Sequence, residues 1–119
     1  MTHTVFKLVD RASWEAASPS GSFDGSAADA RDGFIHFSTA AQLRETAARH
    51  FAGQPDLLLV AVAAASLGDA LRWEPSRGGA LFPHLYAPLP LRAVLPTPRD
   101  TASLLKALGT AIAATGDAA

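Results

Sequence analysis

Residues 33–42 read GFIHFSTAAQ, an apolar strand pattern that runs directly into a helix start. The segment from Gly33 to Phe37 predicts a buried strand because apolar side chains fill most of it. Thr39 and Gln42 have the spacing of a capping box, so we expect a helix from residue 40 to about residue 52. Strand and helix therefore meet where Ser38 and Thr39 join them.

Three segments further out also have strand patterns. Val5–Val9 predicts a short first strand, and Asp10 is placed to cap a helical turn over residues 11–17. The run LLLVAV at residues 57–62 has no polar alternation, which is typical of a central strand covered on both faces. Leu91–Leu95 is expected to form a last strand.

The remaining segments are assigned from their turn residues and periodicity. Residues 18–31, rich in Ser, Gly, Ala and Asp, predict a long loop. Prolines 83, 88 and 90 restrict the segment around His84 to an edge strand. Apolar residues at helical spacing predict a helix over residues 101–115. Because strands and helices do not alternate regularly, we expect an α+β fold with small mixed or antiparallel sheets.

Composition limits the class of protein. The chain has 119 residues, 49% of them hydrophobic and 18% charged, so we expect a single domain over residues 1–119. Its longest apolar run, residues 57–65, is too short to span a membrane, and because the first residues lack the basic start and apolar stretch of a signal peptide, we expect none. The absence of cysteine predicts a cytoplasmic location, and a net charge of −1 predicts no nucleic-acid partner. The oligomeric state stays open.

The first of two histidine-bearing segments is DGFIHFST at residues 32–39. On a strand, Phe34, His36 and Ser38 share one face, so His36 would project beside the helix start at Ser38 and Thr39. The free N–H groups of a helix start can bind a phosphate or carboxylate, which suggests a small anionic ligand. Alternatively, Ser38 and Thr39 only cap the helix and His36 is a core histidine bonded to the backbone.

The second segment, FPHLYAPL at residues 82–89, places Phe82, His84 and Tyr86 on one face. An imidazole beside a phenol can orient a ligand or transfer a proton. The alternative is a stiff strand in which the Tyr86 hydroxyl only binds a neighbouring loop.

Arg72, Glu74 and Arg77 flank the same region. Glu74 could serve as a general base or bind ribose hydroxyls, or it could form a surface salt bridge with Arg72. His36, His84, Asp32 and Glu74 are suitable metal ligands, but their spacing matches no metal motif, and we expect none.

The blocks DGFIHFST, RWE at residues 72–74 and FPHLYAPL resemble a family of small bacterial and plant proteins of unknown function, over Val5 to Val94. The family is described as similar to the ADP-ribosyltransferases. The resemblance implies an ADP-ribosyltransferase-like fold, in which two small sheets and flanking helices surround a cleft for NAD. It also implies that His36 lies near a position that stacks on nicotinamide, that Lys7 replaces a ribose-binding residue, and that Glu74 is a candidate catalytic glutamate.

Two classes of function follow. In the first, a nucleotide-like or NAD-like ligand binds a cleft between sheets that both histidines line, with residues 18–31 at its rim, and the activity is a transferase or hydrolase of ADP-ribosyl type. In the second, the protein is a non-catalytic structural or protein-interaction domain whose histidines only join parts of the fold. For the first class, the catalytic candidates are His36, Glu74 and His84, and the ligand-binding candidates are Ser38, Thr39, Arg72, Arg77 and Tyr86.

Overall fold

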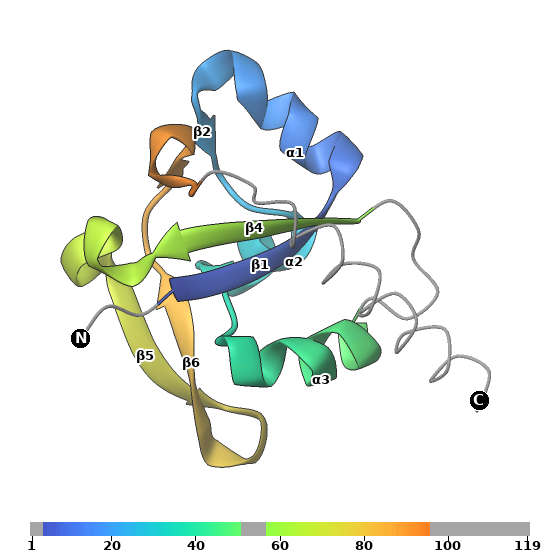
Figure 1. Ribbon diagram of the computed structural model, residues 1–119, viewed down its shortest axis with the longest axis vertical. Coiled ribbons are helices and arrows are strands. Elements are labelled where there is room, and N and C mark those ends of the chain that lie inside the picture. The colour runs from blue at the N-terminus through green and yellow to red at the C-terminus, as the bar shows by residue number, and fades with distance from the viewer. Residues whose placement is uncertain (1–3, 51–56, 96–119) are drawn as a thin grey trace.

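The computed structural model of the chain describes residues 4–50 and 57–95, without the side chains of Ser18, His50 and Arg77. It is an α+β fold of small antiparallel sheets and short helices (Figure 1). The strands are β1 (Thr4–Asp10), β2 (Ser22–Phe23), β3 (Ile35–His36), β4 (Leu57–Ala63), β5 (Leu71–Ser76), β6 (Ala80–Leu85) and β7 (Leu89–Pro90), and the helices are α1 (Arg11–Ala17), α2 (Ala27–Asp32) and α3 (Ala40–His50).

β1 and β4 form a long antiparallel ribbon in which Thr4 pairs with Ala63 and Asp10 with Leu57. α1 and α3 lie on opposite sides of this ribbon (Figure 1). As the sequence predicts, Asp10 ends the strand and caps α1, because its Oδ2 accepts a 2.9 Å hydrogen bond from the backbone N–H of Ser13. Hydrogen bonding from Ser13 holds the pKa of Asp10 below its usual range.

The start of α3 also agrees with its sequence pattern. Gln42 donates its backbone N–H to Thr39 Oγ1 at 3.2 Å, and Thr39 donates its own N–H to Gln42 Oε1 at 3.0 Å. Leu43 and Ala47 pack inward against Leu8 of β1 and Leu59 of β4. The predicted end of this helix beyond residue 50 and the predicted helix at 101–115 lie outside the described residues.

Residues 18–31 are not a long loop. Phe23 in β2 is fully buried and packs against Trp14, with ring centroids 5.2 Å apart, while β2 pairs with β7. α2 then begins after Ser26, whose backbone and side chain form a capping box with Asp29, and ends at Gly33, which adopts a left-handed φ of 87°. Composition suggested a loop, whereas burial of Phe23 and this capping box order the segment.

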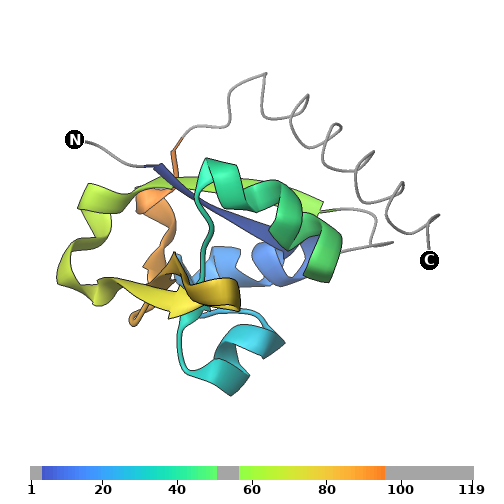
Figure 2. The same ribbon diagram turned by 90° about the horizontal axis from the view of Figure 1, so that it is seen from below.

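The strand that contains Pro83 and His84, β6, lies in a three-stranded sheet with β3 and β5. Its strand order places β6 in the centre, although Pro83 suggested an edge strand. Pro83 removes no hydrogen bond between β6 and β5. Its carbonyl accepts a 3.0 Å hydrogen bond from the N–H of Phe37, and the N–H and carbonyl of one residue in an antiparallel strand point to the same side. The missing donor therefore faces Phe37, just beyond the end of β3. The two views of Figures 1 and 2 place this sheet beside the β1–β4 ribbon.

The predicted strand at residues 91–95 is a 3₁₀ turn over Leu91–Ala93, followed by a single bridge between Val94 and Val62. β4 pairs with β1 along its whole length, but on its other edge only this bridge is present, so β4 is one strand of a two-stranded sheet instead of the expected central strand. Hydrogen bonding divides the described strands into three small sheets rather than two. Within the described residues, no helix is long and apolar enough to cross a membrane.

Candidate functional site

The β3–β6–β5 sheet has one core face and one face that carries most of the polar candidates. Ile35, Leu71 and Leu85 are buried on the core side. His36 and His84 are directly opposed cross-strand partners on the other side, with ring centroids 5.7 Å apart. The two histidines are therefore neighbours on one sheet, whereas the sequence predicted that both line a cleft between two sheets. The strand registers place on this polar face His36, Arg72, Glu74, Phe82 and His84. Phe34 precedes β3, Tyr86 follows β6, and the Phe34 ring contacts the rings of His84 and Tyr86.

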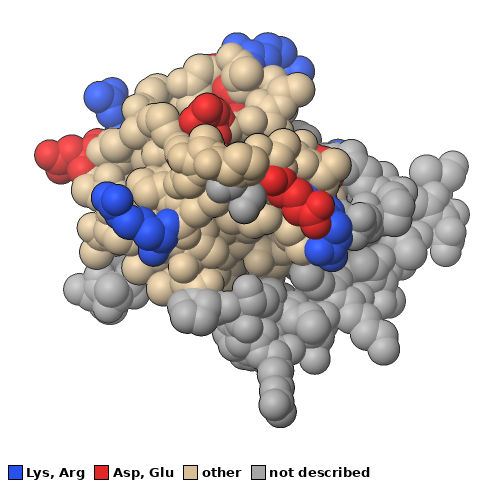
Figure 3. Space-filling view, turned by 90° about the horizontal axis from the view of Figure 1, so that it is seen from above, with Lys and Arg blue, Asp and Glu red and all other residues tan. Residues whose placement is uncertain are grey.

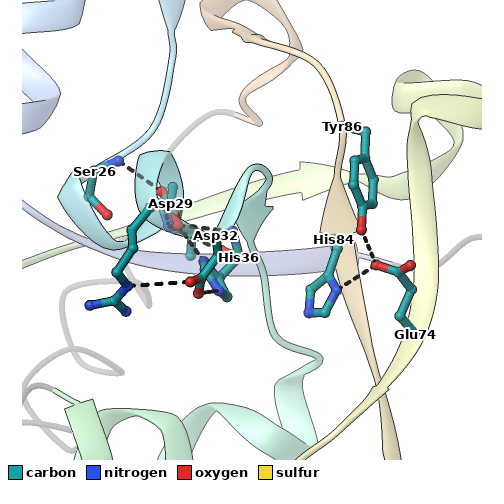
Figure 4. A network of polar contacts seen from close by, with 9 residues as sticks. Ser26, Asp29, Asp32, His36, Glu74, His84 and Tyr86 are labelled. Carbon is teal, nitrogen blue, oxygen red and sulfur yellow. Dashed lines mark hydrogen bonds and ion pairs between the residues drawn. The ribbon is translucent and has the colours of Figure 1, made fainter.

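Glu74 joins His84 and Tyr86 into one hydrogen-bonded group (Figure 4). Its Oε1 lies 2.8 Å from His84 Nδ1 and accepts a 2.6 Å hydrogen bond from the Tyr86 hydroxyl. Bonds from Tyr86 and His84 hold the pKa of Glu74 below its usual range, and the bond to Glu74 raises the pKa of Tyr86. The imidazole and phenol are thus connected through a carboxylate, which the sequence did not reveal.

Aromatic contacts fix the position of the His84 ring. Phe34 stacks on it with centroids 4.0 Å apart, and the same Phe34 ring lies 5.3 Å from the ring of Tyr86. His84 is only 5% exposed, whereas Tyr86 is 41% exposed. The guanidinium of Arg72 lies 4.9 Å from the centroid of the Tyr86 ring, which is a cation–π contact. Among the ion pairs of the described residues, Arg72 does not pair with Glu74, the alternative that the sequence left open.

His36 lies between two carboxylates of α2 (Figure 4). Its Nδ1 is 2.6 Å from Asp29 Oδ1, and its Nε2 is 2.9 Å from Asp32 Oδ2. Asp32 also contacts Arg31 at 3.3 Å. The α2 part of residues 18–31 therefore borders His36, and both ring nitrogens face acidic side chains instead of the start of α3.

Lys7 and Asp29 form a buried ion pair behind His36. Lys7 Nζ lies 3.0 Å from Asp29 Oδ2 and donates to the carbonyl of His36 at 3.1 Å, while the two side chains are 6% and 2% exposed. Burial lowers the pKa of Lys7 against the opposing effect of Asp29. Burial disfavours the charged form of Asp29, but hydrogen bonds and charge from His36 and Lys7 outweigh it and hold the pKa of Asp29 far below its usual range.

The Asp29 carboxylate also accepts hydrogen bonds from two backbone N–H groups. Its Oδ1 also accepts the backbone N–H of His36 at 3.1 Å, and its Oδ2 accepts the N–H of Ser26 at 2.8 Å. One carboxylate thereby connects β1, α2 and β3. A bridge between Phe6 and Ser38, with hydrogen bonds of 2.8 and 2.7 Å, aligns these elements so that Lys7 reaches His36.

Ser38 and Thr39 lie at the start of α3 and are engaged there. Ser38 is buried and its Oγ lies 2.9 Å from Thr46 Oγ1, while Thr39 caps the helix through Gln42. Thr39 therefore has the capping role that the sequence left open as an alternative, whereas Ser38 binds a side chain of α3 and does not cap it. The Arg77 side chain lies outside the described residues.

The charge distribution on this molecule is mixed. On the described surface drawn in Figure 3, basic and acidic side chains form small separate groups, without a continuous basic area. In residues 4–50 and 57–95, no cluster of three or more His, Cys, Asp or Glu side chains is arranged to hold a metal ion.

Sequence reasoning did not assign roles to Asp29 or Phe34, and it reached Lys7 only through the family resemblance. Two local signals were available. Ser26 and Asp29 have capping-box spacing, which predicts a helix start at that point. Lys7 is a single cation on a strand face shared with apolar Val5 and Val9, and a cation buried in such a strand needs an acidic partner.

Comparison with known proteins agrees with the fold. A family model described as a protein of unknown function (DUF952) matches residues 8–97. The crystal structure of protein CC0527 from Caulobacter crescentus is 53% identical, with a TM-score of 0.76, and the match covers 78% of this chain and 82% of that one. The solution NMR structure of CC0527 is also 53% identical, with a TM-score of 0.70 and coverage of 78% and 80%. No curated protein matches the chain.

Proposed function

The chain belongs to the DUF952 family of proteins of unknown function, and we propose that the polar face of its β3–β6–β5 sheet binds a small nucleotide-like ligand. The observation that carries this proposal is His84. Its ring is buried, held at Nδ1 by Glu74 and stacked on Phe34, beside the exposed ring of Tyr86. A carboxylate-oriented imidazole next to aromatic rings is an arrangement used to bind flat ligands and to transfer protons.

Each candidate residue has a role in this proposal. Tyr86 offers an aromatic surface, and Arg72, which lies over Tyr86, offers a positive charge to an anionic part of the ligand. Glu74 orients His84, and His84 accepts a proton from a hydroxyl or a water molecule. His36, held by Asp29 and Asp32, forms the neighbouring wall.

The resemblance to ADP-ribosyltransferases makes NAD and ADP-ribose the first ligands to test. The corresponding activity would be a transferase or hydrolase of ADP-ribosyl type, with NAD as substrate and His84 as proton acceptor. Aromatic surfaces, a cation and a hydrogen-bond acceptor are the groups that such a ligand needs.

A second candidate function is supported by the polar contacts themselves. Asp29, Glu74 and their histidines form hydrogen bonds with one another, as in a domain whose polar groups serve only to connect its elements. In that case the polar face binds no ligand, and the same experiment distinguishes the two functions.

The test is thermal denaturation with NAD, ADP-ribose and a panel of nucleotides. A ligand present at about 100 times its Kd should raise the free energy of unfolding by about 2.7 kcal/mol. Glu74→Gln should weaken that effect, because it removes the charge that orients His84. Glu45→Gln is the matched control, since Glu45 is an exposed residue of α3 that pairs with Arg49 away from the polar face.

Two results would contradict the proposal. One is the absence of any stabilisation by these compounds, together with a larger loss of stability in Glu74→Gln than in Glu45→Gln, which would favour the structural role. The other is ligand stabilisation that Glu74→Gln leaves unchanged, which would place the ligand elsewhere.

A further inference from the structure

The second ring nitrogen of His84 differs from the other buried polar groups of the site. Nδ1 is bound to Glu74, but in the described part of the chain no group forms a hydrogen bond with Nε2. The ring is nevertheless 5% exposed, with Phe34 stacked on it at 4.0 Å. A buried polar atom without a partner is unfavourable, and at such a position a ligand can supply the missing hydrogen bond.

The partners of Glu74 determine which hydrogen bond that nitrogen can form. The ionised carboxylate can only accept, and it already accepts the Tyr86 hydroxyl at 2.6 Å. Nδ1 must therefore carry the proton that points to Glu74. In the neutral ring Nε2 then has a lone pair and no proton, so it accepts a hydrogen bond and cannot donate one.

From this geometry we infer that the site recognises the hydroxyl-bearing nucleoside part of its ligand, through a hydroxyl donated to His84 Nε2, and does not require phosphate. The inference rests on the proposed function and specifies its ligand class. A phosphate group offers mainly acceptors, which a lone pair repels. The aromatic rings of Phe34 and Tyr86 favour a flat base beside the donated hydroxyl.

The same geometry gives a sign for pH dependence. A neutral nucleoside should bind more weakly when acid protonates Nε2, because the protonated nitrogen no longer accepts. An anion would show the opposite trend, since protonation adds a positive charge. The titratable and charged groups that face His84 are Glu74 and Arg72 on β5, Tyr86 just after β6 and His36 on β3, with Asp29 and Asp32 of α2 behind His36.

The first experiment is calorimetric titration of the full chain with five nucleosides: adenosine, guanosine, cytidine, uridine and nicotinamide riboside. At least one should bind, and its dideoxy counterpart should bind at least about tenfold more weakly, because the buried acceptor then stays unpaired. Inorganic pyrophosphate should not displace the nucleoside. These comparisons vary the ligand only, so a folding defect cannot produce the result.

The second experiment reads the tautomer without any ligand. Nitrogen-15 NMR of histidine-labelled protein at alkaline pH should show a protonated Nδ1 and an unprotonated Nε2 for His84. The reverse tautomer would overturn the inference whatever the protein binds. Binding of ADP-ribose without binding of any nucleoside, or equal binding of the dideoxy compound, would overturn it while leaving the proposed function intact. If no nucleotide, NAD, ADP-ribose or nucleoside binds, the proposed function fails, and the inference with it.

Discussion

Replacing Asp29 by asparagine removes the one carboxylate that connects β1, α2 and β3. Asn has nearly the same shape, but one of its terminal atoms donates instead of accepting, and its charge is lost. Lys7, only 6% exposed, would keep the carbonyl of His36 as an acceptor but would lose its counter-charge. Breaking a buried ion pair from one side destabilises a protein by about 3–5 kcal/mol, and we expect Asp29→Asn to fall in that range.

A double-mutant cycle separates the ion pair from general damage. Lys7→Met alone removes the buried cation and leaves Asp29 with three N–H donors, from the His36 ring, the His36 backbone and Ser26. We expect a smaller loss of about 1–3 kcal/mol. In the Asp29→Asn background the same Lys7→Met change should be stabilising, because it removes an unpaired buried charge.

Urea denaturation followed by circular dichroism and tryptophan fluorescence measures these free energies. Acid provides an independent check. Because the pKa of Asp29 is lowered in the folded protein, its stabilising effect is fully present above about pH 4, the ordinary aspartate range, and is lost as pH falls further. Asp29→Asn should lack this acid-dependent loss. Additive effects of the two substitutions, or an Asp29→Asn loss below about 1 kcal/mol, would refute the reasoning.

Two further predictions concern the surroundings of the site. Gly25→Ala should lower the free energy of unfolding, measured in urea melts, by at least about 1 kcal/mol more than Gly21→Ala. Both glycines have positive φ, but only at Gly25 would the new Cβ meet Asp29, at 2.7 Å. Equal losses in the two variants would show that this contact does not matter. Tyr86 is the only tyrosine, so alkaline ultraviolet titration reports its pKa alone. This pKa should lie above the ordinary value of about 10 and return toward it in Glu74→Gln, with circular dichroism showing a folded protein throughout. Identical titrations of both proteins would contradict the bond to Glu74.

Local patterns in the sequence determined those elements whose signals lie within a few residues. Asp10 caps α1 and Thr39 caps α3 because each reaches a backbone N–H three residues ahead. Alternation placed Phe82, His84 and Tyr86 on one face because successive side chains of a strand point in opposite directions. The same kind of local signal, Ser26 followed by Asp29, was present for α2, but the polar composition of residues 18–31 concealed it.

The contacts that make the site depend on segments far apart in the chain. Lys7 meets Asp29 across 22 residues, and Glu74 meets His84 across 10, through pairings that only the assembled sheets define. The central strand accommodates Pro83 because the missing N–H faces Phe37, just beyond the end of β3, an arrangement that no local pattern encodes. The sequence therefore determined which residue types could form the site and which of them share a strand face. Strand register and the packing of α2 decided which carboxylate binds each histidine, because a hydrogen bond depends on distances of a few tenths of an ångström.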